Sequence, residues 1–235
     1  MRSIVPVHIL CFLLTNLDCY SLLCSDNFKI LKKNNRMKQP LVSPLDRTAT
    51  KEAEEMATFY EETLGFTPNS LFTMMHRPRI AAAFLEMNQA VMENKGKLSS
   101  SLKRELAYLS SSVTGCRYCE AHTIRAAERY GSSEERMLNL WEYKTHTAFS
   151  DADRAVFDLA IAASQVPNAV TQEIAENIRK CWDEGEIVEV MGVVALFGYL
   201  NRWNDSMGTA LEDPAAVTAA TLLGHKGWEK GKHQY

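Results

Sequence analysis

Two cysteines three positions apart, followed by a histidine, are the residues of this sequence with the clearest chemistry. Cys116 and Cys119 are separated by two residues, and His122 follows Cys119 after two more. Residues at i and i+3 share one face of a helix, so the two thiols can form a disulfide and the imidazole can reach the second sulfur as a general base. A thiolate in such a set can attack an O–O bond, become a sulfenic acid and condense with the neighbouring thiol. The spacing predicts a peroxidase-like or dithiol-exchange site.

The residues around the cysteines favour ionisation of a thiol. Thr114 and Gly115 precede Cys116 and are typical of a helix boundary, which places Cys116 in the first turn of a helix. The partial positive charge of a helix N-terminus stabilises a thiolate and lowers the thiol pKa from its usual value of about 8.5. Two carboxylates are further candidate proton acceptors: Glu120, four residues after Cys116, and Glu105, on the preceding predicted helix.

The rest of the chain predicts helices that can hold this segment in place. Apolar residues recur at helical spacing after residue 50, and no convincing alternating strand pattern is present, so the fold class is all-α. Ser, Thr, Gly and Pro mark the helix ends. The predicted helices span residues 51–64, 71–76, 80–92, 102–112, 116–130, 134–143, 151–164, 172–182, 186–208 and 214–223. A weak echo at an offset of 81 residues pairs Glu105 with Glu186 and Tyr118 with Tyr199, which suggests two related helical halves.

Composition limits the partners and the number of domains. The chain has 235 residues and a formal net charge of −3, which fits one helical domain and leaves no basic footprint for nucleic acid. After residue 40 no run of about 18 apolar residues exists, so we expect no membrane span there. The six cysteines do not resemble the disulfide framework of a small secreted domain, and Cys181, beside Trp182, is interpreted as a core thiol.

The N-terminal residues have a sequence pattern unlike that of the helical domain. Residues 1–37 are interpreted as an atypical N-terminal extension, and residues 38–235 as the helical domain. The apolar residues 4–14 are too short for a membrane span and resemble the core of a signal peptide. Pro6 and His8 interrupt them, and no small-residue cleavage site follows. These features favour a start at Met37, or a disordered tail, over a working signal, and a cytoplasmic location is expected.

Residues 115–123, with Glu105 upstream, resemble the AhpD-like alkylhydroperoxidase group of the carboxymuconolactone decarboxylase family. Residues 201–204, Asn-Arg-Trp-Asn, are similar to that family's Asn-Arg segment. The resemblance covers roughly residues 45–215. It implies an AhpD-like helical bundle, homo-oligomers and thiol-dependent reduction of hydroperoxides, with an external thiol or dithiol as reductant and no cofactor or metal. It also implies that Cys119 attacks the peroxide, that Cys116 resolves the intermediate, and that Glu105 and His122 relay protons.

Two positions depart from the family's pattern. That pattern places eleven residues between its glutamate and first cysteine, and three between its second cysteine and histidine. Here the two intervals are ten and two residues, so Arg104 and Thr123 occupy the expected glutamate and histidine positions. One residue turns a helical side chain by about 100°. The residues expected to relay protons are therefore where this chain differs most from the family's pattern.

Two other functions compete with a peroxidase. A carboxymuconolactone-type decarboxylase does not need paired cysteines, which argues against it. A non-catalytic redox-sensing or zinc-binding helical protein would use Cys116, Cys119 and His122 as three ligands, and the sequence shows no evident fourth.

Overall fold

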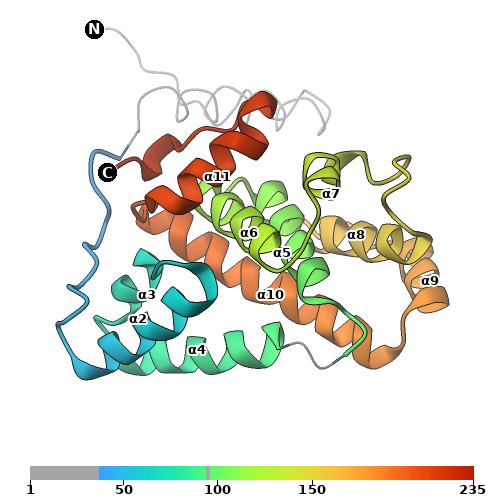
Figure 1. The fold of residues 1–235 in the computed structure, drawn as a ribbon. Coiled ribbons are helices and arrows are strands. Elements are labelled where there is room, and N and C mark those ends of the chain that lie inside the picture. The colour runs from blue at the N-terminus through green and yellow to red at the C-terminus, as the bar shows by residue number, and fades with distance from the viewer. Residues whose placement is uncertain (1–36, 94–95) are drawn as a thin grey trace, which may run out of the picture. The chain divides into compact units, whose positions relative to one another are not determined.

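The computed structural model describes residues 37–93 and 96–235, so the predicted N-terminal extension lies outside the described residues except for Met37. Residues Lys38–Tyr235 form one compact unit. Its elements are helical, as predicted, and no strand occurs in the described ranges. In chain order they are α2 (Lys51–Leu64), α3 (Asn69–Met74), α4 (Pro78–Met92), α5 (Ser100–Thr114), α6 (Arg117–Arg129), α7 (Glu134–Leu138), η2 (Leu140–Glu142), α8 (Asp151–Ala163), α9 (Gln172–Cys181), α10 (Glu184–Met207), α11 (Asp213–Leu223), η3 (Gly224–Lys226) and η4 (Gly231–His233) (Figure 1).

Helices α5 and α6 form a hairpin whose turn carries the cysteines. The Ser99 hydroxyl caps α5, and Gly115 ends it at φ 77°, where its amide donates to backbone carbonyls of the last turn. Cys116 follows with extended backbone, and α6 then runs back along α5. The left-handed turn at Gly115 therefore places both thiols at one end of the hairpin.

This turn gives a direct test of backbone conformation. An alanine at Gly115 meets no atom within 4 Å, so its cost is conformational alone, about 1–2 kcal/mol of unfolding free energy for a left-handed residue. Gly224 is the matched control, because it also has open space but lies at φ −57°. We expect Gly115→Ala to lower the urea midpoint and Gly224→Ala to leave it unchanged or raise it slightly. Equal effects of the two substitutions would contradict this account of the turn.

The long helix α10 packs across the hairpin. It contacts α4, α5, α6 and α8, while α11 lies along α6 (Figure 1). Its buried residues include Val190, Val193 and Leu196, which are fully enclosed in the core. After α11 the chain returns to the end of α10, where the Leu211 amide donates to the His233 carbonyl at 2.9 Å. The end of α10, the start of α6 and the C-terminal η4 therefore meet around the cysteines.

Two sequence expectations about the elements need correction. The helix predicted over residues 134–143 ends at Leu138, and a separate 3₁₀ turn follows at Leu140–Glu142. The weak echo has no structural counterpart: position 115 is the turn between two helices, whereas its equivalent, Leu196, is a buried residue inside the continuous α10. Across the described part of the chain, no helix is long and apolar enough to cross a membrane.

Candidate dithiol active site

Both cysteines are buried free thiols at the start of α6. Cys116 is the N-cap residue, and its Sγ accepts a hydrogen bond from the Cys119 amide at 3.4 Å. The side chain of Asn204, from α10, donates through Nδ2 to Cys119 Sγ at 3.6 Å. Burial, and then the neighbouring Cys116 sulfur, raise the pKa of the Cys119 thiol well above its usual value. Cys119 therefore needs a base to take its proton before it can act as a nucleophile.

Cys119 lies in the wall of a cavity of about 720 Å³. His122, Asn204 and Arg104 supply polar groups to the same wall, whereas Cys116 does not line it. The rest of the lining is mainly aromatic and aliphatic, including Phe59, Tyr60, Leu64, Phe84, Phe197 and Leu200. An apolar cavity with a few convergent polar groups is the usual form of a small-molecule site, and the cysteine that a substrate here would meet is Cys119.

The carboxylate of Glu212, the N-cap residue of α11, positions His122. The His122 Nε2 lies 2.6 Å from Glu212 Oε2, and the imidazole stacks on the Tyr118 ring with centroids 4.2 Å apart. The Tyr118 hydroxyl donates to Glu212 Oε1 at 2.9 Å. Burial, followed by the charge of Glu212, raises the pKa of Tyr118, so the phenol remains a neutral donor. Sequence reasoning missed Glu212, which lies 90 residues from His122 and shares no motif with it.

Glu105 does not lie at the cysteines, which corrects its predicted place in the relay. Its fully buried carboxylate accepts from Arg136 Nε at 2.9 Å and Nη2 at 2.6 Å, and from the Ser132 hydroxyl at 2.6 Å. Ser132 follows the C-terminal end of α6, whereas Cys116 caps its N-terminal end. At 1.5 Å per residue, the thirteen residues of α6 separate these two ends by about 20 Å. Glu105 instead stabilises the end of the hairpin opposite the cysteines, through its bonds to Arg136 and Ser132.

The other candidate acid–base positions are also occupied structurally. Glu120 is buried in an ion pair with Arg117 at 3.0 Å. The Thr123 hydroxyl donates to the Cys119 carbonyl at 2.7 Å, and the Arg104 guanidinium lies 3.8 Å from the centroid of the Tyr130 ring. Neither of the two family relay positions therefore carries a base in this chain.

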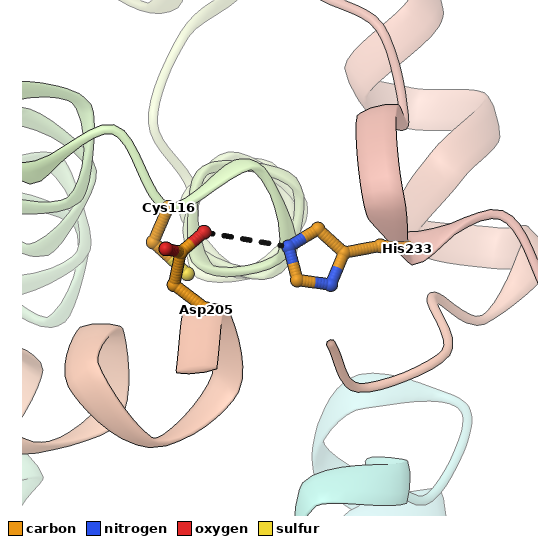
Figure 2. A group of neighbouring side chains, drawn as sticks. All are labelled: Cys116, Asp205 and His233. Carbon is orange, nitrogen blue, oxygen red and sulfur yellow. Dashed lines mark ion pairs between the residues drawn. The ribbon is translucent and has the colours of Figure 1, made fainter. Parts of the chain in front are cut away.

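Cys116 faces a second cluster, formed by Asp205 at the end of α10 and His233 in η4 (Figure 2). One atom from each of these three residues lies within 4.8 Å of the others, and His233 Nε2 is 3.9 Å from Asp205 Oδ1. The other ring nitrogen, Nδ1, bonds the Thr209 carbonyl at 2.7 Å. Burial opposes ionisation of Asp205, but its contacts with His233 and Lys232 hold the pKa of this carboxyl below its usual value. Sequence reasoning missed both Asp205 and His233.

The structure also bears on the zinc hypothesis. The predicted ligand set of two cysteines and His122 is not gathered around one point, because His122 is bound to Glu212. The described residues that come closest to a metal-binding geometry are instead Cys116, Asp205 and His233. The Lys232 ammonium lies 2.9 Å from the second oxygen of Asp205, and this positive charge opposes a divalent ion. The cluster thus suits proton transfer better than metal binding.

The all-helical fold, with a buried Cys-x-x-Cys pair at a helix start, agrees with the AhpD-like fold expected from the sequence. Residues 78–162 match the sequence model of the carboxymuconolactone decarboxylase family. The resemblance stated from the sequence is thereby confirmed.

Three relatives illustrate the range of the similarity. The debrominase Bmp8, in a C82A complex with 2,3,4-tribromopyrrole, superposes with a TM-score of 0.73 and 28% identity over 79% of this chain and 98% of Bmp8. The AhpD core protein of Ralstonia eutropha JMP134 shares the fold with a TM-score of 0.64 and 19% identity over 76% of this chain and 95% of that protein. YnjA of Escherichia coli (strain K12) is 27% identical over 93 residues, which are 39% of this chain and half the length of YnjA.

Proposed function

We propose that this protein is a thiol-dependent peroxidase that reduces organic hydroperoxides through Cys119 and Cys116. The observation that carries the proposal is the placement of Cys119 in the wall of an apolar cavity, one helical turn from both Cys116 and His122. The cavity favours a substrate with an apolar group over hydrogen peroxide. The family resemblance supports the same chemistry, and a decarboxylase would leave the paired thiols without a role.

The proposed cycle balances with two thiols and one hydroperoxide. A base takes the Cys119 proton, the thiolate attacks the terminal peroxide oxygen, and the O–O bond breaks as the alcohol leaves with a proton. Cys116 then attacks the Cys119 sulfenic acid, a disulfide forms and water departs. An external thiol or dithiol returns both sulfurs to the reduced state by exchange.

Titration of the reduced protein with cumene hydroperoxide tests this function. We expect one equivalent of peroxide to be consumed per chain, and mass spectrometry to find a disulfide between Cys116 and Cys119. Hydrogen peroxide, which cannot use the apolar wall, should react more slowly. Unreacted thiols after an excess of both peroxides would refute the proposal.

His122 and Glu212 are the proposed acid–base pair on the cavity side. Because the pKa of Cys119 is raised, we expect the wild-type rate to rise with pH through the alkaline range. His122→Gln should lower the rate of sulfenic acid formation near neutral pH by about 10²-fold, the usual contribution of a general base, and by less at high pH. His225→Gln, at an exposed position in η3, is the matched control and should behave as wild type. A uniform loss at every pH would mean that His122 only supports the cavity wall.

Reductive debromination is the second candidate, because Bmp8 is named a debrominase and covers 79% of this chain. The same dithiol would supply it: a thiolate takes bromine from carbon, the carbon gains a proton, and the second thiol displaces bromide to form the disulfide. Incubating the reduced protein with 2,3,4-tribromopyrrole separates the two functions. Bromide release faster than peroxide reduction would favour the debrominase.

The partners, the assembly and the location are proposals that come from the sequence and its family resemblance. We propose a thiol or dithiol donor, a homo-oligomer and a cytoplasmic location, with no nucleic acid or membrane partner. Light scattering of the purified protein measures the oligomer directly.

A further inference from the structure

The cluster on the far side of the dithiol has no role in the substrate cavity. Cys116, Asp205 and His233 come from three elements, the start of α6, the end of α10 and η4, and their side chains converge as Figure 2 shows. None of the three lines the cavity that contains Cys119 and His122. The dithiol therefore has a histidine on each side.

Hydrogen bonding fixes which nitrogen of the neutral His233 ring carries the proton. A backbone carbonyl can only accept, so the bond from Nδ1 to Thr209 O places a proton on Nδ1. The Nε2 atom is then the free lone pair of the neutral ring. It is buried and has no hydrogen-bond partner, although its residue is only 1% exposed. A buried acceptor without a donor is costly, and the Cys116 thiol, whose sulfur lies within 4.8 Å, is a group that can supply a proton to it.

Two charged groups lie near the His233 ring. Asp205, from α10, lies 3.9 Å away, and Lys232, from η4, forms an ion pair with the same carboxylate at 2.9 Å. From α6, the Tyr118 ring packs 5.8 Å away, with its hydroxyl bound to Glu212. Asp205 is thus the group placed to stabilise an imidazolium, and Lys232 offsets part of its charge.

A path to water completes the arrangement. Asp205 also lines a separate polar hollow of about 510 Å³. Its side chain is 43% exposed, whereas Cys116 is fully buried. A proton on His233 can therefore reach solvent through Asp205 without passing through the substrate cavity.

We propose that His233 is the acid–base partner of Cys116 and that Asp205 positions it and connects it to solvent. The Cys116 proton moves to His233 Nε2, and the thiolate attacks the sulfenic sulfur of Cys119. The S–O bond breaks as the S–S bond forms. The departing hydroxide takes up one proton from solvent and leaves as water, and His233 releases one proton to solvent through Asp205, so the protons balance. During reduction of the disulfide, His233 returns a proton to Cys116 as it leaves. This assignment rests on the proposed dithiol chemistry and adds the resolving half of it.

Titration of the reduced protein, without any peroxide, tests the pairing directly. The ultraviolet absorbance of Cys119→Ser, minus that of the Cys116→Ser/Cys119→Ser double variant, reports the Cys116 thiolate. Adding His233→Gln should raise the titration midpoint by about 1 pH unit or more, because the positive partner is lost. His225→Gln is the matched control and should leave the midpoint unchanged.

A second measurement, made on the His233 ring itself, tests the pairing if the His233→Gln variant does not fold. Nitrogen chemical shifts of the His233 ring, followed against pH, should show the imidazolium persisting to higher pH in Cys119→Ser than in the Cys116→Ser/Cys119→Ser protein, because two coupled groups shift each other. Midpoints that do not move in either experiment would overturn the pairing. So would stoichiometric zinc bound by the reduced protein and lost in His233→Gln, which would make the cluster a metal site. Neither titration uses peroxide, so both can be interpreted even if the protein proves not to be a peroxidase.

Discussion

Cys119→Ser is expected to abolish peroxide turnover, by roughly 10³-fold or more, the order of loss seen when a catalytic nucleophile is removed. The reason is geometric, since Cys119 is the cysteine in the cavity wall and Cys116 lies behind it. The measurement is peroxide consumption with an excess of dithiothreitol, followed over many turnovers.

Two comparisons make this result specific to the mechanism. Cys116→Ser should also lose turnover. In a separate experiment without dithiothreitol, it should consume one equivalent of peroxide and accumulate a Cys119 sulfenic acid that dimedone traps. Cys181→Ser, in α9, is the control for loss of a thiol and should remain fully active. Multiple turnover by Cys119→Ser would sink the proposed cycle, and dimedone labelling of Cys116 in wild-type protein would reverse the two cysteine roles.

Glu105→Gln should instead act on stability. Removing one partner of a buried ion pair typically costs about 3–5 kcal/mol of unfolding free energy. Arg136 also contacts Asp153 at 3.3 Å and its side chain is 22% exposed, so we expect about 2–3 kcal/mol here. The midpoint of urea unfolding measures this change.

The control is a surface pair of the same chemistry. Glu55 pairs with Lys51 one turn away on α2, and both side chains are mostly exposed, so Glu55→Gln should change the unfolding free energy by less than about 0.5 kcal/mol. If Glu105 were a relay residue, Glu105→Gln would change the pH dependence of sulfenic acid formation while the protein remained stable. We expect the opposite: lower stability and an unchanged pH dependence.

Local patterns predicted the fold well because helices are encoded locally. The caps predicted at Ser99 and Thr171 and the glycine at 115 mark boundaries that the structure reproduces within a few residues. Asp183, which was interpreted as part of a turn, is the N-cap of α10. The place of the two cysteines at the start of a helix could be predicted for the same reason, since i, i+3 spacing and a helix start are properties of one segment.

The partners of the cysteines were not readable from the sequence. Glu212, Asp205 and His233 reach the site through packing of α10, α11 and η4, and no spacing rule connects them with residues near 120. Glu105 shows the converse error. Glu105 lies one residue from the family's glutamate position. In the structure, however, its carboxylate lies at the end of the hairpin opposite the cysteines, where it binds Arg136 from another helix.

Glu212 also joins three parts of the chain. Its carboxylate accepts from the Asn69 amide at the start of α3, from Tyr118, and from His122, so one side chain from the last quarter of the protein connects α3 with α6. His233, in η4, is a second residue from the C-terminal segment that lies beside the cysteines. Both histidines beside the dithiol therefore owe their positions to residues synthesised last. A chain that ended at Gly208 would retain both thiols, His122 and Asp205 but would lack Glu212 and His233. Under the proposed mechanism, we therefore expect such a chain to react slowly with peroxide.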